Sequence, residues 1–142
     1  MVSALTGLGA AMLHELPSFP DTNGLLVVTA ESPRPFPVQR VFTVHSDSGE
    51  VRGQHAHREC SQFLVCLSGS FRIMLHNGTE TWEVSLDRPS IGLLIPPFIW
   101  ASELSEADGS VLLVLCDREF DEAEYIRDFD DFLAVTLADL VE

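Results

Sequence analysis

The sequence contains no lysine, and its eight basic side chains, all of them arginine, are outnumbered by 22 acidic ones. The formal net charge at pH 7 is −14. A chain of this charge repels phosphate backbones and anionic lipid head groups, so we expect neither nucleic acid nor a membrane as a partner. Each arginine is a candidate for binding an anion, because the planar guanidinium group matches a phosphate with two parallel hydrogen bonds.

Cysteine is scarce as well. Cys60, Cys66 and Cys116 form no zinc-ligand pair, and three thiols cannot all form disulfides with one another. Unpaired thiols are typical of a reducing compartment, so we expect a cytoplasmic protein. No apolar run approaches the roughly 18 residues that cross a bilayer. The first residues also lack the basic segment of a signal peptide.

Short apolar runs separated by glycine and proline turns are the main feature that is present. They cover about four-fifths of the chain and read as strands. The pattern then changes to helical spacing, with Ile126, Phe129 and Leu133 following the acidic start at Asp121. Many short strands closed by one helix predict an all-β fold, a double-sheet jelly roll with a short C-terminal helix. The expected strands lie in residues 24–30, 38–46, 61–75, 82–86, 92–97 and 110–116.

The length of 142 residues and a hydrophobic content of 46% fit a single domain with its own core. Within it we expect an N-terminal extension and strand over residues 1–34. The jelly-roll core should cover residues 35–117, and a helical segment residues 118–142.

Two of the five histidines, His55 and His57, are one residue apart in an expected strand. Positions i and i+2 of a strand point to the same face, so the two imidazoles should lie side by side. Such a pair can hold a metal ion, move protons or fill space. An imidazole free of metal titrates near neutrality, and proton chemistry is therefore the use that we favour.

The residues around this pair resemble the first motif of the cupin superfamily. Gly49, His55, His57 and Gly69 have the expected order and spacing, but Gln62 stands where a metal-binding cupin generally has an acid. The later hairpin, residues 87–104, contains no histidine to complete a ligand set. Two imidazoles and a neutral amide are a poor site for a divalent ion, so we predict no metal and no cofactor.

Four further stretches resemble a narrower group, the sugar-nucleotide 3,4-ketoisomerases, which are cupin enzymes acting on dTDP-4-keto-6-deoxyglucose. They are RVFTV (40–44), RGQHAH (52–57), GLLIPPFIW (92–100) and FDEAEYIRDFDDF (120–132). The resemblance implies a metal-independent isomerase that moves a ketone from C4 to C3 through an enediol, in deoxysugar biosynthesis. It also implies a homodimer, with N-terminal strands exchanged between the subunits.

Carried over to this chain, the resemblance makes His55 the base or proton shuttle. His57 becomes its partner, which holds the tautomer of His55 or polarises the substrate oxygen. Arg52 would stabilise an oxyanion or bind the substrate phosphate. The chain departs from the family at Phe42, where a tyrosine is common, and at Ala101, where many members have a histidine. A phenyl ring cannot relay a proton as a phenol can.

The remaining candidates for substrate binding are Arg40 and Arg72 for the diphosphate, Gln62 for orienting the ligand, and Trp100 for stacking on the base or the sugar. Phe42, in the same strand as Arg40, is a further candidate for contacting the substrate. For Arg72 and Trp100, a surface position and loop packing are the simpler interpretations. Tyr125 and Arg127 are expected to pack and cap the helix. Asp121, Glu122 and Glu124 are expected to form its solvated start.

Three other functions stay open at this point. A nucleotide-sugar epimerase would exchange a proton at C3 or C5 without moving the carbonyl group. A non-catalytic cupin would bind a nucleotide sugar or a small acid without turnover. A metal-dependent cupin oxygenase or isomerase would contain a stoichiometric ion.

Overall fold

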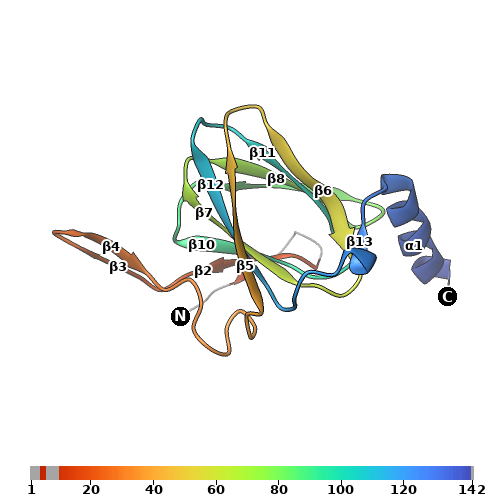
Figure 1. The fold of residues 1–142 in the computed structure, drawn as a ribbon, viewed down its shortest axis with the longest axis horizontal. Coiled ribbons are helices and arrows are strands. Elements are labelled where there is room, and N and C mark those ends of the chain that lie inside the picture. The colour runs from red at the N-terminus through yellow and green to blue at the C-terminus, as the bar shows by residue number, and fades with distance from the viewer. Residues whose placement is uncertain (1–3, 6–9, 142) are drawn as a thin grey trace.

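Two antiparallel sheets lie face to face in the computed structural model, which describes residues 4–5 and 10–141 (Figure 1). The first sheet has the strand order β1 (Ala4–Leu5), β2 (Met12–Glu15), β10 (Ile91–Ile95), β7 (Gln62–Ser68), β12 (Ser110–Cys116) and β5 (Arg40–Ser46). The second has the order β13 (Tyr125–Ile126), β6 (Val51–His57), β11 (Trp100–Ser105), β8 (Phe71–His76) and β9 (Thr81–Leu86). This architecture confirms the predicted all-β jelly roll.

The main core fills the space between the sheets. It is built from alternate side chains of facing strands, such as Leu64 and Leu112 from the first sheet and Phe71, Ile73 and Leu75 from the second. Each of these is at most 1% exposed. A fully buried leucine or phenylalanine contributes roughly 1.5–3 kcal/mol, so these strands need no disulfide to hold them together.

The N-terminal part contributes to the first sheet and also extends beyond it. Strand β2 pairs with β10, so the sheet begins before residue 35, where the sequence pattern placed the start of the core. Strands β3 (Ser18–Asp21) and β4 (Gly24–Val27) form a hairpin that projects away from the sandwich (Figure 1).

The C-terminal part differs from the prediction. A short 3-10 helix, η1 (Glu122–Glu124), and the two-residue strand β13 precede the α-helix α1 (Phe129–Val141). The helix therefore begins at Phe129 and not near Asp121, and Asp128 caps it by accepting a hydrogen bond from the backbone N–H of Asp131. None of the helices that the structure describes has the length and hydropathy needed to cross a membrane.

Strand β11 was not predicted from the sequence, because its small and polar residues face the interior of the sandwich while its large apolar residues face outward. The inward positions Ala101, Glu103 and Ser105 are small or polar, although all three are buried. Trp100 points outward, where it packs against Phe129 and Phe132 of α1. The helix thus covers one end of the second sheet, next to β6 and β13 (Figure 1).

Candidate active site

Strand β6 carries the two histidines on the inner face of the second sheet, as predicted. Ala56 between them faces outward and packs with Ile126 and Phe132 under α1. The rings of His55 and His57 are perpendicular, with centroids 4.9 Å apart. The pair therefore lies inside the sandwich, on the face opposite to the helix.

A backbone irregularity in β6 precedes His55. Ala101 of β11 pairs with His55, but the next residue pairs with Gly53, so one residue of β6 is extra. Gly53 has a φ of +82°, and a Cβ atom built on it would lie 1.9 Å from Oε2 of Glu103. Only glycine fits here, because both the positive φ and the contact exclude a side chain.

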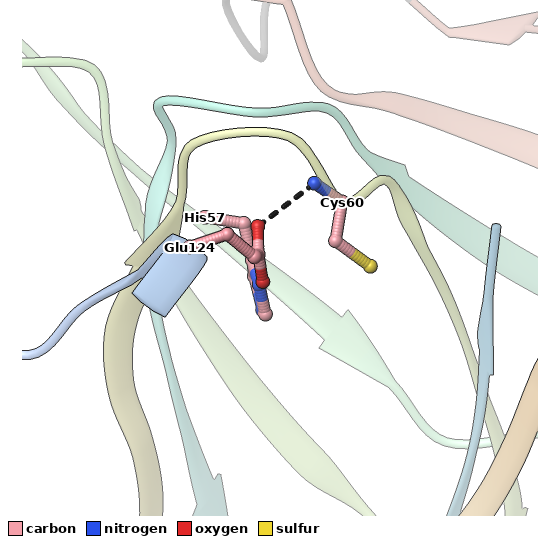
Figure 2. Close-up of side chains that lie close together, drawn as sticks. All are labelled: His57, Cys60 and Glu124. Carbon is pink, nitrogen blue, oxygen red and sulfur yellow. Dashed lines mark hydrogen bonds and ion pairs between the residues drawn. The ribbon is translucent and has the colours of Figure 1, made fainter. Parts of the chain in front are cut away.

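His57 is held by a carboxylate from the other end of the chain. Its Nδ1 is hydrogen-bonded to Oε2 of Glu124, and both residues are about 5% exposed. The other oxygen of Glu124, Oε1, accepts hydrogen bonds from the backbone N–H groups of Glu59 (3.0 Å) and Cys60 (2.9 Å; Figure 2). The interpretation of Glu124 as part of a solvated helix start is therefore wrong.

This arrangement fixes the tautomer of His57. Burial alone would raise the pKa of Glu124, but the hydrogen bonds from His57 and from the backbone of Cys60 and Glu59 lower it below the ordinary value. An ionised carboxylate can only accept a hydrogen bond, so Nδ1 of His57 carries the proton. The other ring nitrogen, Nε2, is buried and has no hydrogen-bond partner among the described residues.

His55 is kept uncharged. Burial is the main cause that lowers the pKa of His55 to about 4, and a positive charge on the neighbouring His57, when that ring is protonated, acts in the same direction. At neutral pH its imidazole is therefore unprotonated and able to accept a proton. The site thus contains one imidazole that is hydrogen-bonded to a carboxylate, His57, and one whose Nδ1 has no partner among the described residues, His55.

Tyr125, the only tyrosine of the chain, lies against both imidazoles. Its ring centroid is 5.0 Å from that of His55 and 4.4 Å from that of His57. Its hydroxyl accepts a hydrogen bond from Nη1 of Arg40 at 3.2 Å. The sequence predicted that Tyr125 packs against the helix, but the structure places its phenol beside the histidines, on β13. The chain therefore has a phenol at this site although Phe42 of β5 replaces the tyrosine that is common in the family.

Arg40 points inward from β5, and its guanidinium group is held by aromatic rings. Its Cζ lies 4.5 Å from the ring centroid of Phe42 and 5.1 Å from that of Phe120. Within the described part of the chain no carboxylate lies at ion-pair distance from it. Its positive charge is therefore available to an anionic ligand beside the histidines.

A second carboxyl group faces the interior of the sandwich from β11. Glu103 pairs with Arg52 of β6 and lies one inward position beyond Ala101, which pairs with His55. Burial raises the pKa of Glu103 to about 8, although the charge of Arg52 opposes the shift. Glu103 is therefore a neutral acid near pH 7, and no partner for its Oε2 occurs in the described residues.

The other predicted site residues divide into two groups. Gln62 is buried on the inner face, where its Nε2 donates to Sγ of Cys116 at 3.6 Å. Arg72 lies on the outer side of β8 and forms an ion pair with Glu106 at 2.7 Å, so the structure does not bring it to the histidines. Trp100 is likewise turned away and packs under α1. Arg72 thus matches the surface interpretation, whereas Trp100 packs between β11 and a helix and not in a loop.

A cavity of about 740 Å³ lies elsewhere, on the outer face of the first sheet. It is lined by apolar side chains of the sheet, among them Leu16, Phe63 and Leu94, by His14, and by the proline-rich residues 31–35. Burial lowers the pKa of His14. None of the residues that line this cavity belongs to the histidine site.

Two sets of side chains near His57 could be considered for a metal ion. His55, His57 and Gln62, the residues of the cupin motif, include no anionic ligand. A ring nitrogen of His57, Sγ of Cys60 and a carboxylate oxygen of Glu124 form a second set, with all three atoms within 4.8 Å of one another. Within this second set, Nδ1 of His57 is hydrogen-bonded to Glu124, an arrangement that suits proton transfer.

Comparisons with known proteins place these features in context. The sequence profile of the family described as "FdtA: WxcM-like, C-terminal" matches residues 10–137. The TDP-4-oxo-6-deoxy-alpha-D-glucose-3,4-oxoisomerase of Aneurinibacillus thermoaerophilus is 39% identical over 114 residues, which span 79% of this chain and 82% of that protein.

Solved structures agree. QdtA, a sugar 3,4-ketoisomerase from Thermoanaerobacterium thermosaccharolyticum solved in complex with TDP, is 32% identical with a TM-score of 0.87, covering 94% of this chain and 98% of that one. WlaRB, a TDP-quinovose 3,4-ketoisomerase from Campylobacter jejuni, is 34% identical with a TM-score of 0.82, covering 88% and 98%. NovW, a 4-keto-6-deoxy sugar epimerase from Streptomyces spheroides, is 15% identical with a TM-score of 0.78, covering 88% and 72%, and shares the fold alone.

Proposed function

Because the chain belongs to the FdtA family (WxcM-like, C-terminal) and is a 3,4-ketoisomerase, we propose that it moves the keto group of dTDP-4-keto-6-deoxyglucose from C4 to C3. The family and the isomerase activity confirm the prediction from the sequence motifs. The name of the Aneurinibacillus relative, an oxoisomerase of the same TDP-4-oxo-6-deoxyglucose, supports this substrate. The product would enter deoxysugar biosynthesis.

In the proposed reaction the proton on C3 leaves and a proton arrives at C4, while the proton of the C3 hydroxyl is lost and the C4 oxygen gains one. The intermediate is an enediol, so atoms and charges balance without a redox partner. His55 is unprotonated at neutral pH and accepts the C3 proton. An imidazolium whose pKa is about 4 holds this proton weakly, which suits a shuttle that must return it to C4.

His57 acts on the oxygens. Its Nε2 accepts the hydroxyl proton of C3 and passes it to the C4 oxygen, and the carboxylate of Glu124 stabilises the imidazolium that forms between the two steps. Glu124 is a positioning residue, since it acts through His57. The buried His57–Glu124 hydrogen bond beside the uncharged His55 is the observation that carries this mechanism.

The arginines supply the charge that the substrate needs. Arg40, held by Tyr125 and Phe42, and Arg52, at the exposed part of β6, are proposed to bind the diphosphate. Gln62 is proposed to orient the sugar from the opposite sheet. The reaction uses no metal ion in this proposal, since every proton transfer has a side chain to perform it.

We further propose that the protein is a cytoplasmic homodimer. The hairpin β3–β4 exposes Phe19 (57%), Leu25 (53%) and Leu26 (59%), and a second copy is a partner that would cover them. The apolar cavity at Leu16 and Phe63 lies on the same side of the molecule as the start of this hairpin. The three free cysteines support a reducing compartment.

Incubation with dTDP-4-keto-6-deoxyglucose in deuterated water, followed by NMR, tests the function. We expect a 3-keto product, which carries deuterium at C4 wherever the proton on His55 exchanges with solvent before it is returned. Exchange at C3 or C5 with the carbonyl group still at C4 would make the protein an epimerase. Tight binding of the substrate without exchange or product would leave a non-catalytic cupin and refute the proposal.

A further inference from the structure

Three buried side chains of metal-binding chemistry meet at the end of β6. They are the imidazole of His57, the thiol of Cys60 and the carboxylate of Glu124, each at most 5% exposed. Figure 2 shows them between the end of β6 and the 3-10 helix η1. This cluster is distinct from the cupin ligand set, because it uses Nδ1 of His57 and residues outside the cupin motif.

The distances suit a small tetrahedral ion. Zinc bonds to nitrogen, oxygen and sulfur of about 2.0–2.3 Å put neighbouring ligand atoms roughly 3.3–3.6 Å apart. The three donor atoms already lie within 4.8 Å of one another, so small side-chain rotations would close the site. The backbone N–H groups of Glu59 and Cys60 hold Oε1 of Glu124, which directs its Oε2 toward the imidazole.

A second buried sulfur belongs to the same core cluster. Cys116 is fully buried, packs in the main core together with Cys60 and accepts a hydrogen bond from Gln62. An imidazole, a carboxylate and a thiolate form a ligand set that zinc and other thiophilic divalent ions prefer to calcium or magnesium.

We propose that His57, Cys60 and Glu124 form a binding site for Zn²⁺ or a similar thiophilic divalent cation, and that its occupation stops the isomerase. Binding releases the Cys60 thiol proton to solvent and replaces the proton between His57 and Glu124. A neutral imidazole that coordinates a metal through Nδ1 carries its proton on Nε2. The nitrogen that accepts the hydroxyl proton in the proposed mechanism then becomes a donor. This inhibitory effect rests on the proposed function, whereas the binding itself does not.

Cobalt(II) serves as a spectroscopic probe of the site. We expect metal-free protein to bind one Co²⁺ per chain and to show a near-ultraviolet thiolate-to-cobalt absorption band. Cys60→Ser and Cys60→Ala should lose this band and weaken binding by at least about 10- to 100-fold. Cys66→Ser is the matched control, since Cys66 is equally buried but donates to Ser68 and lies outside the cluster. Absence of the band in the wild type, or its persistence in both Cys60 variants, overturns the site.

Inhibition is measured separately, with each variant compared with its own metal-free rate. Zn²⁺ should suppress turnover of the wild type and of Cys66→Ser, EDTA should restore it, and Cys60→Ser should need at least about tenfold more Zn²⁺. Full turnover by cobalt-loaded or zinc-loaded wild type refutes the inhibitory role. If the metal-free wild type shows no isomerase activity, the proposed function fails, and the cobalt spectra still decide whether the site exists.

Discussion

Glu124 and His57 are 67 residues apart in the sequence and share a buried hydrogen bond inside the sandwich. The strand β13, which pairs Tyr125 with His57 and Ile126 with Ala56, brings them together. The carboxylate sets the tautomer of the imidazole and supplies the negative charge that a protonated ring needs.

Replacement of Glu124 by glutamine should lower kcat by roughly 10²- to 10⁴-fold, the range of a general acid–base contribution. The amide can no longer stabilise an imidazolium and can donate to Nδ1, which would put the proton on Nε2. Glu122→Gln is the matched control, because Glu122 lies two residues earlier but is exposed and paired with Arg127. Equal rates in the two variants, with both folded by circular dichroism, would exclude Glu124 from the mechanism.

The ring of His55 should titrate well below the ordinary histidine range. Because the pKa of His55 is lowered to about 4, the free enzyme keeps this base unprotonated until the pH approaches that value. We therefore expect the NMR signals of the His55 ring to shift toward pH 4 and not around 6.5, and His55 to limit kcat/KM only in that range. The titration is followed while the protein stays folded, and a midpoint near 6.5 for the His55 ring would show that it is not the unprotonated base described above.

Glu103→Gln should change how stability depends on pH. The pKa of Glu103 is raised from 4.5 to about 8 in the folded protein, so the stability that its neutral form provides is complete below pH 4.5. This contribution is lost as the pH rises through about 8, because the unfolded chain releases the proton earlier.

The melting temperature of the wild type relative to Glu103→Gln should therefore fall between pH 4.5 and pH 8 and then level off. Glu83→Gln, on the exposed face of β9, provides the control and should show no such trend. A difference between wild type and Glu103→Gln that does not change with pH would contradict the buried neutral carboxyl group.

Tyr125→Phe retains the ring that packs on both histidines but removes the hydroxyl that accepts from Arg40. Loss of one such hydrogen bond corresponds to about 0.5–1.5 kcal/mol, so KM should rise roughly 2- to 13-fold while kcat changes less. Steady-state kinetics with the dTDP-sugar measures both. A loss confined to kcat and larger than about 100-fold would instead make the phenol a proton carrier.

The projecting hairpin gives a prediction about assembly. Leu25→Glu combined with Leu26→Glu places two charges on the exposed apolar surface and should convert the dimer into a monomer. Size-exclusion chromatography with light scattering measures the mass. Thr22→Glu, at the tip between β3 and β4, is the control for added charge alone. A wild type that is monomeric at high concentration would refute the homodimer.

Much of the fold could be predicted because most strands alternate apolar and polar residues in register with the two faces of their sheet. His55 and His57 were placed correctly for the same reason, since the period of a strand fixes which residues share a face. Strand β11 escaped prediction because Trp100 faces a helix, while Glu103 faces the interior. Its apolar and polar positions are therefore exchanged relative to the usual pattern.

Glu124 and Tyr125 could not be identified as site residues from local pattern. Their segment is rich in acids, and helical spacing continues through it into α1, so it resembles an exposed helix start. The structure breaks this segment into η1 and β13, because Ile126 is buried against Ala56 and Tyr125 against the imidazoles. The role of Glu124 follows from its contact with His57, which lies 67 residues away in the sequence. A pattern of neighbouring residues cannot predict a contact over that distance.

The two-residue strand β13 also determines when during folding the site is complete, because it carries the last residues of the site to join β6. A nascent chain that has emerged only as far as β12 already contains every strand of the first sheet and four strands of the second. Its imidazole at position 57 would nevertheless have no counter-charge, because the carboxylate is still to come. The barrel therefore acquires its proton-handling ability last, when the tail docks on the free edge of β6.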